Sequence, residues 1–182
     1  MVPPERVIAG RPGPPSPARL VARFSIGFAA IFLLLAAAAS GETAAAGLRQ
    51  PLARLIVRAA AGVLSPFSQV GFSESILWYR TSWIEVVDAC DGVIPSCIFL
   101  AAVLAVPGHW RAKLWGCLLG VPAILAINLV RIVSLVLLGA WRPDLFEKVH
   151  IYVGQALVIA SSLALWLSWA ERFVRPGARG SA

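Results

Sequence analysis

Long apolar segments alternate with short polar segments along most of the chain. Four apolar segments stand out, at residues 24–40, 92–106, 114–141 and 150–169. A helix needs about 20 apolar residues to cross a bilayer, so the first two segments are at the short limit and the last two are long enough. The pattern predicts an all-α integral membrane protein, a polytopic bundle of about four transmembrane helices. We assign the last three helices, within residues 92–170, to one three-helix membrane core.

The first apolar segment allows two interpretations. It follows residues 1–23, a basic and Pro-rich stretch that cannot bury a core and is expected to form a disordered cytoplasmic arm. Small residues at Ala37, Ala39 and Gly41 resemble a cleavage site, so residues 24–40 could belong to a signal peptide. We favour a retained transmembrane helix, because a Pro-rich leader of this length is long for a signal peptide.

Residues 41–91 are expected to lie outside the membrane. Within residues 51–66, apolar side chains recur at helical spacing, at Leu52, Leu55, Ile56, Ala59 and Val63. Arg54 and Arg58 lie on another face, so this segment is predicted to be an amphipathic helix at the outer surface. Two short runs of aromatic and β-branched residues within 67–87 indicate a small hairpin after it.

The composition agrees with a membrane protein. Hydrophobic residues make up 59% of the chain, charged residues make up 14%, and the mean hydropathy is +0.79, which is too apolar for an ordinary soluble domain. The net charge of +7 is also found in nucleic-acid-binding proteins. Here, however, Lys and Arg flank the apolar segments and form no basic stripe with interleaved aromatic residues, so no nucleic acid partner is expected.

The distribution of charge predicts the topology. Of the nine acidic residues, only Glu5 and Glu171 fall in the three proposed inside segments, residues 1–23, 107–113 and 171–182. These segments hold most of the Lys and Arg, and cytoplasmic segments of membrane proteins are enriched in these residues. Both termini are therefore expected in the cytoplasm, and residues 171–182 form a basic cytoplasmic tail.

Three chemically active residues stand at or near the ends of apolar segments, where polar groups are costly and suggest function. Cys90 lies just before the outer end of the second span, and His150 opens the fourth span. Arg131 lies about 17 residues into the third span, which is roughly 25 Å from its inner end at 1.5 Å per residue. The three residues are therefore expected at one level, towards the outer face.

These three residue types suit nucleophilic catalysis by cysteine. A helix N-terminus and a nearby cation lower the pKa of a thiol; Cys90 has the first, and Arg131 can supply the second. Asp91 opposes this by like-charge repulsion. A neutral His150 at a helix N-terminus can take a proton from the thiol or from water. Arg131 can stabilise the oxyanion that forms when a thiolate attacks a peptide carbonyl.

Two polar residues are predicted to support this site. Asn128 and Ser134 lie three residues either side of Arg131, on the same broad face of the third span, and can donate hydrogen bonds there. The remaining cysteines, Cys97 and Cys117, are interpreted as apolar fillers, because the chain has no CxxC spacing that would indicate a zinc site. No cofactor is expected, because chemistry by thiol, imidazole and guanidinium needs none.

The motifs resemble those of the exosortase/archaeosortase family. Cys90-Asp91-Gly92 precedes an apolar helix, residues 128–134 (NLVRIVS) lie within the next, and His150 opens the last. The short chain is similar to the small exosortase H type, and the resemblance covers about residues 76–170. The middle residue of the Cys-x-Gly motif is commonly small or amidic in this family, so Asp91 is a departure from it.

The resemblance implies a membrane cysteine transpeptidase of the bacterial cytoplasmic (inner) membrane, with its active site facing the periplasm. Family substrates are exported proteins with a tripartite C-terminal sorting tail, which consists of a recognition motif, a transmembrane helix and a basic cluster. The enzyme is thought to cut near the motif and to pass the new carboxyl end from a Cys thioester to a membrane lipid or another envelope acceptor. Carried over, Cys90 is the nucleophile, Arg131 the oxyanion or thiolate stabiliser and His150 the acid/base, with Gly92 as a supporting residue.

Two other functions remain open. A hydrolytic intramembrane cysteine protease would use the same three residues and pass the acyl group to water. A non-catalytic assembly or transport component would instead use Asn128 and Arg131 to brace its helices. Such a component would keep its function after the substitution Cys90→Ala.

Overall fold

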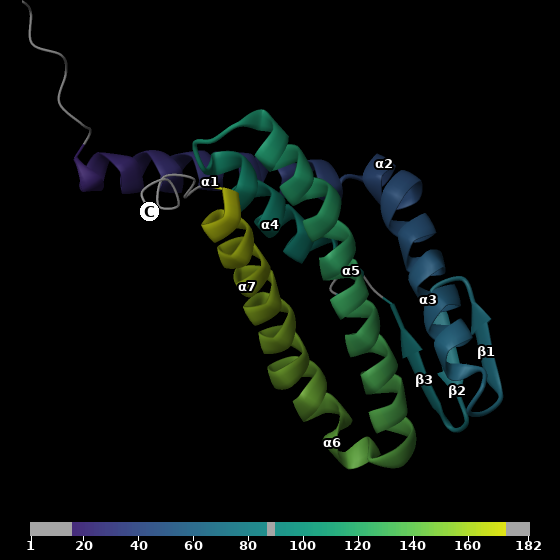
Figure 1. Cartoon of the computed structure of the whole chain (residues 1–182). Coiled ribbons are helices and arrows are strands. Elements are labelled where there is room, and N and C mark those ends of the chain that lie inside the picture. Colours follow the sequence, from purple (N-terminus) through teal and green to yellow (C-terminus); the bar gives the residue numbers. More distant parts are fainter. Residues whose placement is uncertain (1–15, 87–89, 174–182) are drawn as a thin grey trace, which may run out of the picture.

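The computed structural model describes residues 16–86 and 90–173 (Figure 1). The elements along the chain are α1 (Pro17–Ser40), α2 (Glu42–Ala44), η1 (Ala45–Arg49), α3 (Gln50–Leu64), β1 (Val70–Ser73), β2 (Ile76–Tyr79), β3 (Ser82–Glu85), α4 (Val93–Ala105), α5 (Trp110–Trp141), α6 (Pro143–Lys148), η2 (Val149–Gly154) and α7 (Gln155–Phe173). The segments η1 and η2 are π-helical. Helix α6, η2 and α7 follow one another directly as one long helical run.

Three helices in the described part of the chain are long and apolar enough to cross a membrane. They are α1, α5 and the run Pro143–Phe173, while α4 is apolar but has only 13 residues. A small sheet is present beside them. These observations confirm the predicted all-α membrane bundle with a small β-structure.

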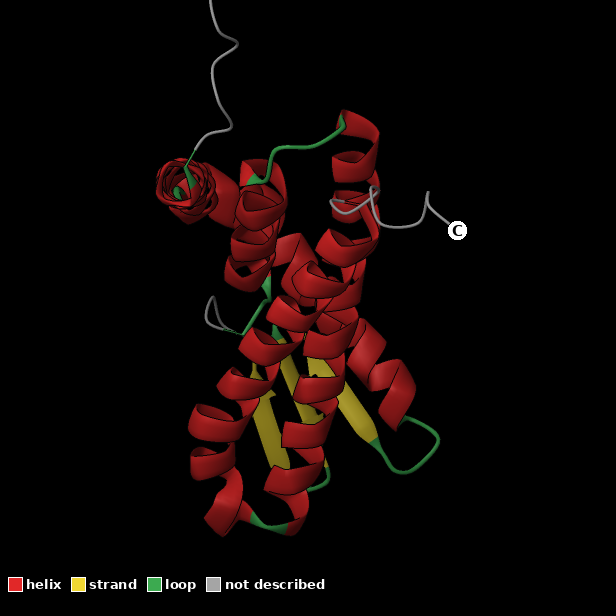
Figure 2. Ribbon diagram, turned by 60° about the vertical axis from the view of Figure 1, so that its left-hand side comes forward, coloured by secondary structure: helices red, strands yellow, loops and turns green. Residues whose placement is uncertain are grey.

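The long helices are not all parallel. Helices α5 and α7 lie side by side in opposite directions, with α4 packed against both, whereas α1 lies across one end of this group (Figures 1 and 2). At that end, Phe99 and Val103 of α4 meet Ile124 of α5 and Trp169 of α7 in one buried cluster. Helix α1 contributes Ala39 to a separate cluster with α4.

The first helix begins earlier than the sequence pattern predicted. Helix α1 starts at Pro17, so residues 17–23 are helical rather than part of the predicted disordered arm. A proline suits the first position of a helix, because its missing N–H would have no partner there in any case. The other residues of the predicted arm and most of the predicted tail, 1–15 and 174–182, lie outside the described residues.

Helix α3 is amphipathic as predicted, but it buries a different face. Its buried residues recur at three- and four-residue intervals, at Ala53, Ile56, Val57, Ala60, Ala61 and Leu64. Leu55 and Val63 were expected on the apolar face, yet they are 64% and 49% exposed. The small alanines of the buried face allow α3 to pack closely against the sheet and α5, and this packing decides the rotation of the helix.

The small sheet has one strand more than the predicted hairpin. Its order is β1-β2-β3 with antiparallel pairing, and both turns contain a non-glycine residue with positive φ, Glu74 and Arg80. The central strand β2 was missed because neither turn has the Asn-Gly or Asp-Gly sequence typical of such hairpins. One face of the sheet buries Leu77 and Ile84 against α3 and the half of α5 near α6.

Candidate active site

The structure brings Cys90 and His150 together, although they are 60 residues apart in sequence. The Sγ atom of Cys90 lies 3.9 Å from Nε2 of His150. Cys90 is buried in the turn before α4, and the half-buried His150 lies in η2, where its ring stacks on Phe146. A π-helical turn within a longer helix is often found at a functional site. This geometry places an imidazole nitrogen next to the thiol.

The turn that holds Cys90 depends on Gly92 and Asn128. Gly92 has φ +79°, a left-handed conformation that glycine adopts without strain. A Cβ atom at this position would lie 3.2 Å from Nδ2 of Asn128, so the turn packs directly on α5. Asn128 Nδ2 donates a hydrogen bond to the carbonyl oxygen of Cys90 at 2.7 Å. Both residues were predicted as supporting residues, and the structure places both against the Cys90 turn.

Arg131 is buried beside this turn and makes two long contacts to side-chain oxygens. It is 5% exposed, and its contacts to Oδ1 of Asn128 and Oε1 of Gln155 are both 3.5 Å long. Its Nε is buried without a hydrogen-bond partner among the described residues. Hydrogen bonds at 3.5 Å are weak, so this guanidinium has donors to offer to a further acceptor.

The side chain of Arg131 packs directly against Gly154, the last residue of η2. A Cβ atom on Gly154 would lie 2.8 Å from Nε of Arg131, closer than real Cβ contacts allow. Gly154 and Gln155 were missed by the sequence analysis. Gln155 carried one usable signal, because a polar side chain inside an apolar span is costly and points to function.

Ser134 is not brought to the site. Its hydroxyl donates a hydrogen bond to the carbonyl oxygen of Val130, one turn earlier in α5, at 2.8 Å, and the side chain is exposed. The expectation that Ser134 would donate towards Arg131 therefore does not hold in the structure. A serine hydroxyl within a helix readily bonds to a carbonyl of the preceding turn, and that local bond occupies its proton here.

A buried ion pair adjoins Cys90. Asp91 is 2% exposed, and its Oδ2 accepts a hydrogen bond from Nε of Arg49 at 2.7 Å. Its Oδ1 accepts the backbone N–H of Val93 at 2.8 Å, which stabilises the first turn of α4. Arg49 was missed, since it lies 42 residues before Asp91 and no local spacing connects the two.

Burial adds a third effect to the two charges expected to act on the Cys90 thiol. Burial raises the pKa of the Cys90 thiol above its usual range; the positive charge of Arg131 opposes this rise, and the Asp91 carboxylate adds to it. The opposing effects of Arg131 and Asp91 have the predicted directions, and the loss of hydration, which the sequence analysis did not consider, outweighs the nearby cation. A thiol with a raised pKa needs a base at the moment of attack.

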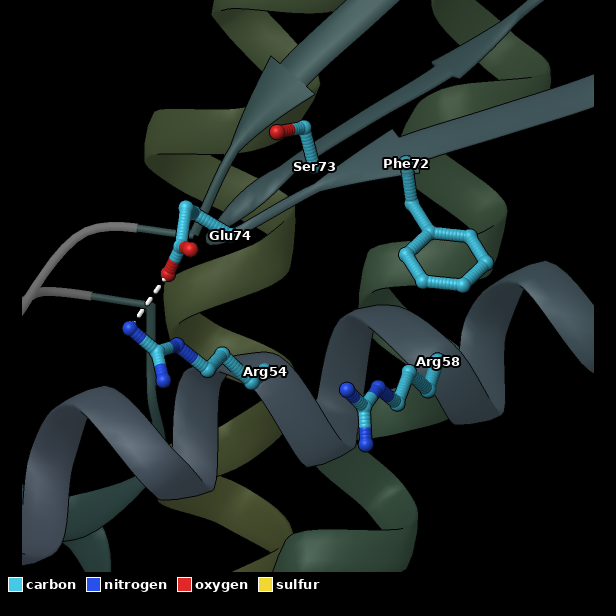
Figure 3. A pocket seen from close by; sticks show the side chains of 5 residues that line it. All are labelled: Arg54, Arg58, Phe72, Ser73 and Glu74. Carbon is cyan, nitrogen blue, oxygen red and sulfur yellow. Dashed lines mark ion pairs between the residues drawn. The ribbon is translucent and has the colours of Figure 1, made fainter.

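A separate pocket of about 260 Å³ opens between α3 and the turn that joins β1 to β2. It is lined by Arg54, Arg58, Phe72, Ser73 and Glu74, as Figure 3 shows. An ion pair between Arg54 and Glu74 joins its two sides. None of the residues around Cys90 lines this pocket.

The sequence of the chain matches one family of membrane proteins. The family described as transmembrane exosortase (Exosortase_EpsH) matches residues 21–167. The chain belongs to the exosortase family. The predicted resemblance is thereby confirmed, and the matched range includes Cys90, Arg131 and His150 of this exosortase. Neither the curated proteins nor the solved structures contain a match to the chain.

Proposed function

We propose that this exosortase is a membrane cysteine transpeptidase that cleaves the C-terminal sorting tail of exported proteins. The observation that carries the proposal is the 3.9 Å approach of Cys90 Sγ to His150 Nε2, with the buried guanidinium of Arg131 beside the thiol. A nucleophile, a base and a fixed cation come from three separate elements. This is the set of groups that acyl transfer through a thioester requires.

The first half of the reaction forms the thioester. His150 Nε2 takes the proton of the Cys90 thiol as sulfur attacks the peptide carbonyl carbon, and the carbonyl oxygen becomes an oxyanion. When this intermediate collapses, the C–N bond breaks and the protonated His150 gives its proton to the leaving amine. The tail leaves with a free amino end, and the exported protein stays joined to Cys90 by a thioester.

The second half returns the enzyme to its starting state. His150, now neutral, takes a proton from the nucleophile of the acceptor, which attacks the thioester carbonyl. The C–S bond then breaks, and the proton on His150 returns to the Cys90 sulfur. We propose a membrane lipid or another envelope component as the acceptor; with water in its place the same steps give hydrolysis.

Arg131 supports both halves in this mechanism. Its buried guanidinium makes two contacts of 3.5 Å to side-chain oxygens, and its Nε has no hydrogen-bond partner among the described residues. A fixed donor that is poorly satisfied at rest gains hydrogen bonds when an oxyanion forms, and this difference lowers the barrier.

The proposed orientation places the site towards the periplasm. Arg131 lies 21 residues after Trp110, the first residue of α5, which corresponds to about 32 Å along the helix. This length is close to the thickness of the hydrocarbon core, about 30 Å. With both termini in the cytoplasm of a bacterial cell, the site would open at the outer boundary of the inner membrane.

The proposal is tested with an exported protein that carries a tripartite C-terminal tail. This protein is co-expressed with the wild type or with Cys90→Ala, and its intact mass is measured. The variant Cys97→Ala serves as a matched control, because Cys97 is also a buried cysteine but lies within α4. Loss of the tail with the wild type and Cys97→Ala only is the expected result, and mass added to the new end distinguishes transfer from hydrolysis. Equal processing by Cys90→Ala would overturn the proposal.

A further inference from the structure

The buried ion pair next to Cys90 has no part in the chemistry proposed above. Asp91 directly follows Cys90, and Arg49 is the last residue of η1, at the start of α3. Their side chains are 3% and 8% exposed, and 2.7 Å separates Nε of Arg49 from Oδ2 of Asp91. A buried ion pair is costly to desolvate and persists only when its geometry is good and its atoms are hydrogen-bonded.

Asp91 connects three segments of the chain. One carboxylate oxygen accepts from Arg49 and the other accepts from the backbone N–H of Val93 in α4, while the backbone of Asp91 continues the Cys90 turn. On the other side of this turn, Asn128 of α5 holds the Cys90 carbonyl oxygen. The turn is therefore fixed from the external segment through Asp91 and from the membrane helices through Asn128.

We propose that Arg49 is a positioning residue that holds the Cys90 turn in place through Asp91. This inference rests on the proposed function of Cys90 as the nucleophile. It also explains how an acidic residue is compatible with this position of the motif: its carboxylate is paired and turned towards the external segment.

The same pair limits the effect of Asp91 on the thiol. Among residues 16–86 and 90–173, the charged or titratable groups at Cys90 are Asp91 in its own turn, Arg131 from α5, His150 from η2 and, through Asp91, Arg49 from η1. The Asp91 carboxylate disfavours the thiolate. Because Arg49 pairs with this carboxylate at 2.7 Å, its opposite charge is expected to offset part of that effect. Loss of Arg49 would leave an unpaired carboxylate next to the nucleophile.

The first test measures processing of a tail-bearing substrate. Arg49→Gln is expected to slow processing by about tenfold or more, because a buried charge loses its partner. The double variant Arg49→Gln/Asp91→Asn is expected to recover most of the rate, since the two amides can form a hydrogen bond without charge. Arg54→Gln is the matched control on α3, because Arg54 forms an exposed ion pair with Glu74, and it is expected to leave the rate unchanged.

The second test does not depend on catalysis. The rate at which iodoacetamide alkylates Cys90 is measured against pH in the full-length protein, and peptide mass mapping separates Cys90 from Cys97 and Cys117. The profile is expected to move to higher pH in Arg49→Gln, to lower pH in Asp91→Asn, and back towards the wild type in the double variant. Asp91→Asn keeps the test usable where Arg49→Gln fails to accumulate.

The two tests separate the two claims. Wild-type processing and a wild-type alkylation profile in Arg49→Gln would overturn the positioning role, and so would a double variant no better than the single one. If the alkylation profiles shift as expected but the wild-type protein processes no tail, the role of the Arg49–Asp91 pair is supported and the proposed function is contradicted.

Discussion

Asn128 donates a hydrogen bond from its side-chain amide to the carbonyl oxygen of Cys90, 38 residues earlier, at 2.7 Å. The oxygen of the same amide lies 3.5 Å from Nη1 of Arg131. One buried side chain thus connects the turn of the proposed nucleophile to the proposed oxyanion stabiliser. Changes that disturb either contact are expected to alter catalysis before they alter the rest of the fold.

Asn128→Ala should reduce processing of a tail-bearing substrate strongly. The substitution leaves the buried carbonyl oxygen of Cys90 without its donor, which costs about 1–3 kcal/mol, and it frees the turn to move. Ser134→Ala is the matched control on the same helix, because its hydroxyl bonds only to Val130 among the described residues. Processing rates followed by intact mass check this prediction, and equal rates for the two variants would contradict it.

Gly92→Ala should destabilise the protein by about 1–2 kcal/mol, the cost of a left-handed conformation for a residue with a Cβ atom. The φ of +79° and the 3.2 Å approach of that Cβ atom to Asn128 both oppose the substitution. Thermal unfolding in detergent measures the effect. Gly62→Ala in α3, where a Cβ atom would meet nothing within 4 Å, should instead be neutral or stabilising. Similar loss in both variants would argue against the described turn.

Gly154→Ala should impair catalysis by displacing Arg131. The added methyl group would lie 2.8 Å from Nε, which sits in the middle of the arginine side chain and cannot move without shifting the guanidinium. We expect kcat to fall more than KM changes, because the proposed oxyanion contact would be made in the transition state. Gly27→Ala in α1, whose nearest neighbouring atom is 3.9 Å away, is the control. An unchanged kcat in Gly154→Ala would contradict the prediction that the position of Arg131 depends on the absence of a side chain at Gly154.

Alkylation of Cys90 should become faster as pH rises, since burial raises the pKa of this thiol and only the thiolate reacts. The positive charge of Arg131 favours the thiolate, so Arg131→Gln should raise the pKa further and move the alkylation profile to higher pH. Measurement of the rate at several pH values checks the direction. A shift of Arg131→Gln to lower pH would contradict the geometry described for this pair.

Helix length and the placement of polar residues predicted much of the site from the sequence alone. Cys90, Arg131 and His150 were expected at one level because each follows from counting residues along an apolar span, and the structure brings Cys90 within 3.9 Å of His150. Asn128 could be predicted in the same way, since it lies one turn from Arg131 on a regular helix.

Features that depend on tertiary packing could not be predicted in this way. The rotation of α3 about its axis depends on which alanines contact the sheet. The hydroxyl of Ser134 donates its hydrogen bond to the carbonyl oxygen of Val130 in the same helix. Arg49 lies 42 residues before Asp91, and no periodic spacing in the sequence relates the two. The thiol pKa depended on the degree of burial of Cys90, which a sequence pattern does not give.

The most direct test of the account is to locate the acyl group on the enzyme. The wild-type protein is mixed with a tail-bearing substrate, quenched with acid during turnover, digested and mapped by mass. We expect the new carboxyl end of the substrate on the peptide that contains Cys90, removable by hydroxylamine, and no such adduct in Cys90→Ala. Processing of the substrate by Cys90→Ala, or an adduct on another residue, would contradict the assignment of Cys90 as the nucleophile.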